Sequence, residues 1–106
     1  MRIYLSGPIT GHRSARRDFA SVERRLRWAG EQDIVNPEAV LRSLRMEHNE
    51  YMHVCKALLE VSDVVLLLPG WRRSTGACME VGFALSKQMK IFELDADFSG
   101  VHELKF

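Results

Sequence analysis

The sequence predicts a three-layer α/β domain of the Rossmann-like or flavodoxin-like class, with residues 1–106 forming a single domain. Short apolar runs alternate with helical patterns along the whole chain, which is typical of βαβ units in a parallel sheet. One of these runs, residues 64–68, is uninterrupted, as expected of a central strand buried on both faces. We expect a parallel sheet of four or five strands, the first four in the order 2-1-3-4.

The N-terminal third predicts one strand and one helix. Residues 3–5 are rich in strand formers, and the glycines and proline of residues 6–11 end the strand in a tight loop. Apolar residues then recur every three or four positions from 15 to 29, which predicts a helix. Ser14 is a suitable N-cap for this helix, and Gly30 is a suitable end.

The middle of the chain predicts a second short strand and two further helices. Ile34 and Val35 form the strand, which ends at the turn Asn36-Pro37. Residues 38–60 are helical in pattern, with a break near residues 46–49.

The C-terminal third begins with the central strand at residues 64–68. Pro69, Gly70 and Trp71 end that strand, and residues 74–88 return to helical spacing with Leu85 on the inward face. Residues 91–94 supply a fourth strand.

Composition excludes several classes of function. The chain has 15 basic and 14 acidic residues, so its net charge of +1 does not support a broad nucleic-acid footprint. The arginine-rich helix at residues 15–29 has two interpretations. It is either a solvated helix face or a surface that binds nucleic acid. No apolar run approaches the ~20 residues of a membrane span, and no signal peptide is evident. We therefore expect a cytoplasmic protein without membrane contact.

Metal and disulfide chemistry are not expected either. The two cysteines, Cys55 and Cys78, lie within apolar helical patterns rather than at a metal-ligand spacing. The four histidines are scattered along the chain, without carboxylates or cysteines at a spacing that completes a site. We expect no cofactor and no metal.

Two loops are candidates for a ligand site. Ligands of open α/β sheets bind beyond the carboxyl ends of the strands, where the strand order reverses. Residues 7–11 follow the first strand and residues 69–76 follow the third, and these two strands are neighbours in the predicted order. The glycines of the first loop allow close approach of a phosphate to backbone N–H groups, although a plain tight turn explains them equally well.

Glu80 stands out in the helix after the second loop. Gly76 and Ala84 flank it at helical spacing of four, so a ligand could reach its carboxylate past small neighbours. The alternatives are a surface glutamate or a buried salt-bridge partner.

Three segments together resemble the nucleoside 2-deoxyribosyltransferase-like superfamily. They are residues 3–11 (IYLSGPITG), the pair Asn36-Pro37, and residues 63–84 (DVVLLLPGWRRSTGACMEVGFA). The chain looks closest to short phage-type members, and it is more distantly similar to 2′-deoxynucleoside 5′-phosphate N-hydrolases.

The resemblance implies cleavage or transfer at the N-glycosidic bond of a (deoxy)nucleoside or its 5′-monophosphate. Glu80 matches the family's nucleophile, and Tyr4 matches a tyrosine that could orient it, although core packing also explains Tyr4. Trp71 could stack on a base, or it could cover the sheet edge or a subunit interface. The substrate-binding residues expected on this basis are Gly7, Pro8, Ile9, Thr10, Gly11, Asn36, Trp71, Ser74 and Gly76.

The sequence also departs from the family. Cys55 occupies the place of an aspartate that assists the leaving group or contacts the sugar, and a thiol of ordinary pKa is a poor substitute. Pro8 and Thr10 replace a serine and an arginine of the phosphate-hydrolysing members. The alternative function is therefore a non-catalytic nucleotide-binding module of the same fold.

Two further expectations follow from related enzymes. The loop before Glu80 loosely resembles that of phosphoribohydrolases, which break the same bond in nucleoside monophosphates. Homologous enzymes form dimers or larger assemblies, so the resemblance implies a homo-oligomer acting on a small-molecule nucleoside or nucleotide.

Overall fold

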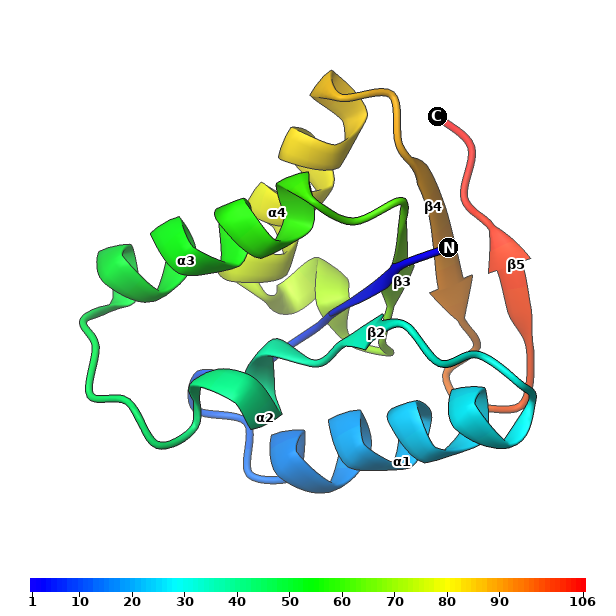
Figure 1. The fold of residues 1–106 in the computed structure, drawn as a ribbon, viewed down its shortest axis with the longest axis horizontal. Coiled ribbons are helices and arrows are strands. Elements are labelled where there is room, and N and C mark those ends of the chain that lie inside the picture. Colours follow the sequence, from blue (N-terminus) through cyan, green and yellow to red (C-terminus); the bar gives the residue numbers. More distant parts are fainter.

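The computed structural model describes all 106 residues and has the predicted three layers, with helices on both faces of a five-stranded sheet (Figure 1). The strands are β1 (Ile3–Ser6), β2 (Ile34–Val35), β3 (Val64–Leu67), β4 (Lys90–Leu94) and β5 (Val101–Glu103). The helices are α1 (Ala15–Trp28), α2 (Pro37–Leu41), α3 (His48–Glu60) and α4 (Thr75–Ser86), with a short 3₁₀ turn, η1 (Trp71–Arg73), before α4.

The sheet has the order β2-β1-β3-β4-β5. The first four strands are parallel, as predicted, and Tyr4 on β1 lies opposite Val35 on one side and Val65 on the other. The fifth strand corrects the expectation of an all-parallel sheet, because β5 pairs with β4 in the antiparallel sense. Only six residues, 95–100, connect these two strands. A parallel crossover needs a dozen or more residues, so this short connection requires β5 to run antiparallel to β4.

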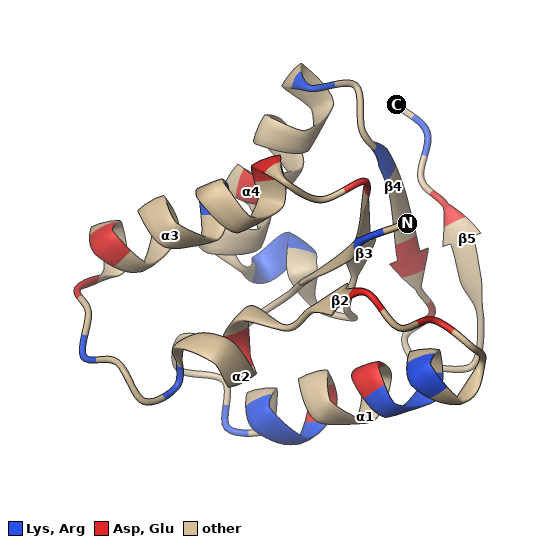
Figure 2. Cartoon of the chain, in the orientation of Figure 1, with Lys and Arg blue, Asp and Glu red and all other residues tan.

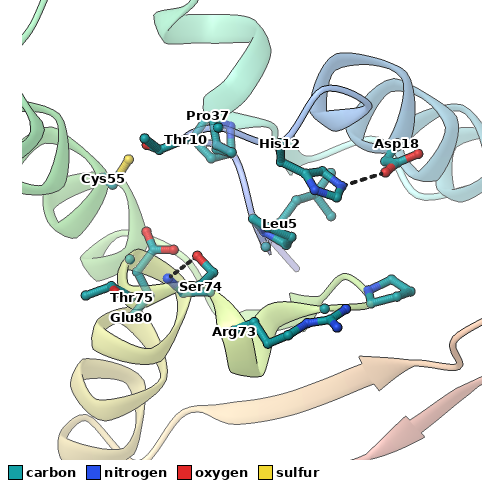
Figure 3. A pocket seen from close by; sticks show the side chains of 18 of the residues that line it. Leu5, Thr10, His12, Asp18, Pro37, Cys55, Arg73, Ser74, Thr75 and Glu80 are labelled. Atoms are coloured by element: carbon teal, nitrogen blue, oxygen red, sulfur yellow. Dashed lines mark hydrogen bonds and ion pairs between the residues drawn. The ribbon is translucent and has the colours of Figure 1, made fainter.

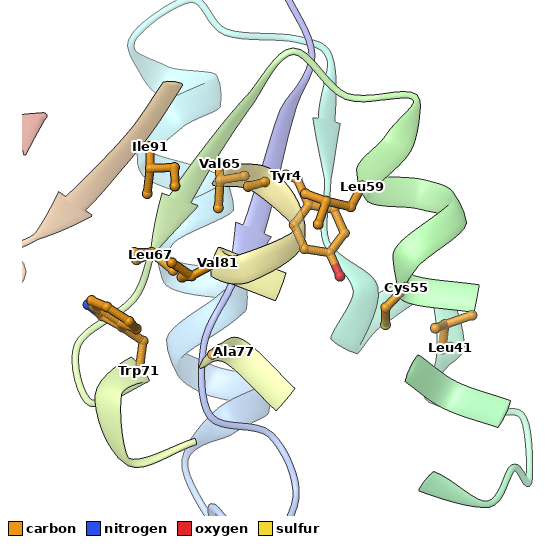
Figure 4. Packing of buried hydrophobic residues seen from close by; sticks show 11 residues of the cluster. Tyr4, Leu41, Cys55, Leu59, Val65, Leu67, Trp71, Ala77, Val81 and Ile91 are labelled. Carbon is orange, nitrogen blue, oxygen red and sulfur yellow. The ribbon is translucent and has the colours of Figure 1, made fainter. Parts of the chain in front are cut away.

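Alternate residues of the strands pack into two separate cores. Ile3 and Leu5 face α1, where Phe19 is fully buried among them. Tyr4 faces α3 and α4 instead, and it packs with Leu59, among others, on that side (Figure 4). Because successive side chains of a strand point to opposite faces, β1 contributes to both cores.

The predicted helices are present, and their ends differ in detail. The break between α2 and α3 falls at residues 42–47. The side chain of Ser14 does not cap α1 and donates a hydrogen bond to Asp18 instead. Leu85, expected on the inward face of α4, is exposed in the last turn of that helix. No helix is both long and apolar enough to cross a membrane.

Gly7, at the end of β1, is required by close packing. A Cβ atom built at this position would lie 2.8 Å from Cβ of Leu68, a distance that real side chains do not reach. We expect Gly7→Ala to destabilise the protein by about 1–3 kcal/mol, because backbone or core must shift. Urea unfolding followed by circular dichroism measures this. The matched change Gly82→Ala meets open space in the middle of α4 and should be neutral or stabilising.

Candidate functional site

A cavity of about 870 Å³ opens at the carboxyl edge of the sheet (Figure 3). The loop after β1, the loop between β3 and α4, and the first turns of α1 and α3 surround it. Its volume lies in the range of roughly 300–1,000 Å³ that is usual for small-molecule sites. This is the position where the strand order reverses between β1 and β3, and it is where open α/β sheets bind ligands.

Glu80 projects into this cavity from the second turn of α4. Only 8% of the residue is exposed. Two hydroxyl groups from β1 hold its carboxylate: Tyr4 donates to Oε2, and Ser6 Oγ donates to Oε1 at 2.7 Å. Tyr4 and Ser6 are two positions apart on one strand, so both side chains point to the same face of the sheet.

The surroundings of Glu80 determine its charge. Burial raises the pKa of the Glu80 carboxyl above its ordinary value, and the hydrogen bonds from Tyr4 and Ser6 oppose this rise because they stabilise the charged form. Burial, together with the charge of Glu80, raises the pKa of Tyr4 far above its ordinary value. Tyr4 therefore remains a neutral hydrogen-bond donor to the carboxylate.

Cys55 lies beside this pair, on the side of the cavity formed by α3. Burial raises the pKa of its thiol to about 11, so Cys55 is a protonated thiol at neutral pH. Tyr51 lies one helical turn before it, and its buried hydroxyl makes no hydrogen bond. The wall next to Glu80 thus offers neutral donors and no second carboxylate.

Most of the residues predicted from the sequence come together around the cavity. Besides Tyr4 and Glu80, the lining includes Gly7, Pro8, Ile9, Thr10, Gly11, Ser74 and Gly76. Ser74 caps α4 by accepting a hydrogen bond from the backbone N–H of Ala77 at 3.2 Å. A Cβ at Gly76 would lie 3.2 Å from Sδ of Met52, so this glycine lets α3 approach the mouth of the site.

Two predicted residues lie elsewhere. Trp71 is buried in the core beneath η1, and its indole N–H donates to Glu93 at 2.6 Å, so its ring is not available to stack on a base (Figure 4). Asn36 caps α2 and donates to Glu23, and it does not line the cavity. Both side chains have structural partners that explain them.

Several residues of the site were not anticipated from the sequence. Ser6 could have been found, because strand alternation places it on the same face as Tyr4. Arg73 immediately precedes the Ser74 cap, and no carboxylate pairs with it. His12 and Asp18 meet across the junction of a loop and a helix, a contact that no sequence spacing specifies.

The arginine-rich helix α1 also carries acidic residues. Basic and acidic residues are interspersed along α1 (Figure 2), where Arg27 pairs with Glu23 at 2.8 Å and Arg17 with Asp18 at 3.5 Å. Part of the arginine-rich helix is therefore neutralised locally. No group of three His, Cys, Asp or Glu side chains is arranged to hold a metal ion.

Fold and site together define a Rossmann-like α/β domain with a buried carboxylate at the centre of a ligand-sized cavity. The chain belongs to the family described as "Domain of unknown function (DUF4406)", whose profile matches residues 1–93. This match includes Tyr4, Glu80 and both loops of the cavity, and it ends within β4. A search of curated proteins gives no significant match.

Proposed function

We propose that the protein cleaves or transfers at the N-glycosidic bond of a (deoxy)nucleoside or its 5′-monophosphate, with Glu80 as the nucleophile. The observation that carries this proposal is the state of the Glu80 carboxylate. It is buried, it accepts from two hydroxyl groups, and no cation pairs with it. A buried charge normally has an ionic partner, whereas this one faces a cavity.

The chemistry of glycosides explains why such a carboxylate is useful. The transition state at C1′ resembles an oxocarbenium ion, whose positive charge an unpaired carboxylate stabilises. One oxygen of Glu80 bonds to C1′ while the C1′–N bond breaks and its electrons leave with the base. Tyr4 and Ser6 keep the carboxylate oriented during this step. Water then attacks C1′ and frees the sugar, or a second base attacks and completes a transfer.

The rest of the cavity suits the remaining parts of such a substrate. The first turn of α4 leaves the N–H groups of Thr75 and Gly76 without a partner, and Arg73 stands beside them. N–H groups at a helix N-terminus and a guanidinium group both favour a phosphate. The loop at residues 7–11 lies on the opposite side, where it could contact the sugar or the base.

Release of a free base tests the proposal. We would incubate the protein with the four common 2′-deoxynucleosides and ribonucleosides, and with their 5′-monophosphates, and separate the products by chromatography. The proposal predicts release of a base from at least one of these compounds, or exchange of its base when a second free base is added. Absence of release and exchange across the whole panel would contradict it.

Tyr4→Phe removes one of the two donors to Glu80. Loss of a hydrogen bond to a charged group costs about 1.5–3 kcal/mol, so we expect base release at neutral pH to fall roughly 10- to 100-fold. The pKa of Glu80 should rise further, because the charged form loses a stabilising contact. Activity is lost as pH falls through that pKa, so the acidic limb of the pH–rate profile should move to higher pH.

Tyr51→Phe is the matched control for Tyr4→Phe. These are the only two tyrosines of the chain, and the hydroxyl of Tyr51 makes no hydrogen bond. For Tyr51→Phe, the acidic limb of the pH–rate profile should lie at the same pH as in the wild type. A profile of Tyr4→Phe that also coincides with the wild type would show that Tyr4 does not support the Glu80 charge.

A non-catalytic nucleotide-binding module is the second candidate, and Cys55 is the observation that favours it. A neutral thiol with a pKa of about 11 cannot replace a carboxylic acid that protonates a leaving group. Under this alternative a nucleotide raises the melting temperature without being consumed. Thermal unfolding followed by chromatography of the same sample distinguishes the two functions.

We propose that the protein acts in the cytoplasm and as a homo-oligomer. Both cysteines are free thiols, as is usual in a reducing compartment. Support for assembly comes from α4, whose outer face carries Met79 and the open position Gly82 but no charged side chain. Sedimentation of the purified protein measures the oligomeric state.

A further inference from the structure

The proposed reaction needs a proton donor for the departing base, and Cys55 does not supply one. Displacement at C1′ places the nucleophile and the leaving group on opposite sides of that carbon. The donor must therefore lie across the cavity from Glu80. Cys55 projects from the same side of the cavity as Glu80, so it is unsuitable in position as well as in acidity (Figure 3).

His12 lies on the far side of the same cavity. It belongs to the loop between β1 and α1, it lines the cavity, and its ring extends towards Asp18 of α1 (Figure 3). Histidine is the side chain best suited to hold and release a proton near neutral pH. Of the two histidines that line the cavity, only His12 has hydrogen-bond partners, whereas His48 has none.

Two side chains fix the orientation of the His12 ring. Ser14 Oγ donates its proton to Asp18 Oδ2 at 2.8 Å, and the same oxygen lies 3.0 Å from His12 Nε2. The hydroxyl has only one proton, so towards His12 it can only accept. Asp18 Oδ2 lies 3.4 Å from Nε2 and is also an acceptor. Both neighbours therefore require a proton on Nε2.

This arrangement assigns different roles to the two ring nitrogens. Nε2–H is held by Ser14 and Asp18, while Nδ1 makes no hydrogen bond within the protein. Nδ1 is thus the ring nitrogen that is free to contact a substrate. Asp18 is itself held in place, because Arg17 lies 3.5 Å from its other oxygen.

We propose that His12 is the catalytic acid of this site and that Asp18 is its positioning residue; the proposal rests on the function proposed above. The His12 imidazolium gives its Nδ1 proton to a nitrogen of the base as the C1′–N electrons move onto the base and a Glu80 oxygen bonds to C1′. In the second half, Nδ1 takes a proton from the attacking water. The water oxygen bonds to C1′, and the electrons of the ester bond return to Glu80.

Two substrates with different leaving groups test this proposal. One is whichever natural deoxynucleoside or 5′-monophosphate the wild type hydrolyses fastest, and the other is 4-nitrophenyl 2-deoxyriboside, whose leaving group departs without protonation. His12→Gln should lower kcat for the natural substrate by about 10²- to 10⁴-fold, the usual contribution of a general acid. Cleavage of the nitrophenyl compound should change less than about threefold.

Three further variants complete the design. Glu80→Gln should lose both activities, because both substrates need the nucleophile. His53→Gln is the matched control, since His53 is exposed on α3 outside this cavity. Asp18→Asn should also lower kcat for the natural substrate selectively, but by a smaller factor than His12→Gln. A purely structural role for the loop would affect both substrates equally.

The outcomes separate this inference from the proposed function. Equal losses on both substrates in His12→Gln, or no loss on either, would overturn the role of His12 and leave Glu80 in place. Wild-type cleavage of the nitrophenyl compound, without release or exchange of any natural base, would overturn both the role of His12 and the proposed action on natural nucleosides. Failure of the wild type on both substrates would contradict the proposed function itself, and the inference with it.

Discussion

Glu80→Gln is expected to abolish release of the nucleobase, with a loss of at least about 10³-fold, because an amide cannot act as the nucleophile. Glutamine keeps the shape of the side chain in a site that leaves 8% of the residue exposed, so the cavity should persist. Tyr4 and Ser6 can still hydrogen bond to the amide, since hydroxyl groups both donate and accept. Chromatographic assay of released base measures the effect.

The thermal stability of Glu80→Gln is the control for this activity measurement. The pKa of Glu80 is raised by folding, so the folded state binds more protons than the unfolded state between the two pKa values. The contribution of Glu80 to stability is therefore fully present below its unfolded pKa and is lost as pH rises through its folded pKa. Glutamine carries no such dependence. The melting temperature of Glu80→Gln relative to wild type should increase from pH 4 to pH 8.

These two measurements distinguish loss of chemistry from loss of fold. An inactive variant that is at least as stable as wild type at pH 8 supports a chemical role for Glu80. Base release that survives the substitution within tenfold would show that another group performs the displacement.

Phe19→Ala is the substitution expected to cost the most stability. Phe19 is fully buried on α1, in the core formed with Ile3 and Leu5 of β1, and its ring lies 3.6 Å from the position that a Cβ at Gly7 would take. Removing a buried phenylalanine side chain costs about 3–5 kcal/mol, because apolar contacts are lost and a cavity remains. Domains of this size have a free energy of unfolding of roughly 5–15 kcal/mol, so a large share would disappear.

Urea unfolding checks this prediction. The midpoint should fall while the slope of the free energy against urea concentration stays constant. Phe106→Ala is the matched control: 75% of Phe106 is exposed at the end of the chain, so its removal should change stability by less than about 0.5 kcal/mol. A cost below about 1 kcal/mol for Phe19→Ala would mean that the α1 face of the sheet is not tightly packed.

The sequence was sufficient to predict the layers and the order of the parallel strands. The apolar run at 64–68 and the alternation of strands with helices are local patterns, and βαβ units have few ways to assemble. The direction of β5 was not predicted, because the sequence patterns gave no bounds for a fifth strand. Once the structure locates β5, its six-residue connection to β4 is too short for a parallel crossover.

The site was only partly predictable. The loops at 7–11 and 69–76 meet because the strands that precede them are neighbours, which the topology implies. The position of Trp71 could not be predicted, since its indole N–H binds Glu93 of β4, which lies 22 residues further along the chain. The contacts among His12, Ser14 and Asp18 likewise depend on how a loop enters a helix, which residue spacing does not specify.

Detection of a covalent intermediate tests the central claim most directly. Acid quenching during turnover of the best substrate, followed by proteolysis and mass spectrometry, would preserve an ester between the sugar and a carboxylate. The account predicts that the peptide containing Glu80 gains the mass of one glycosyl group, and that Glu80→Gln shows no such gain. Rapid base release without this adduct on Glu80, or with the adduct on another residue, would contradict it.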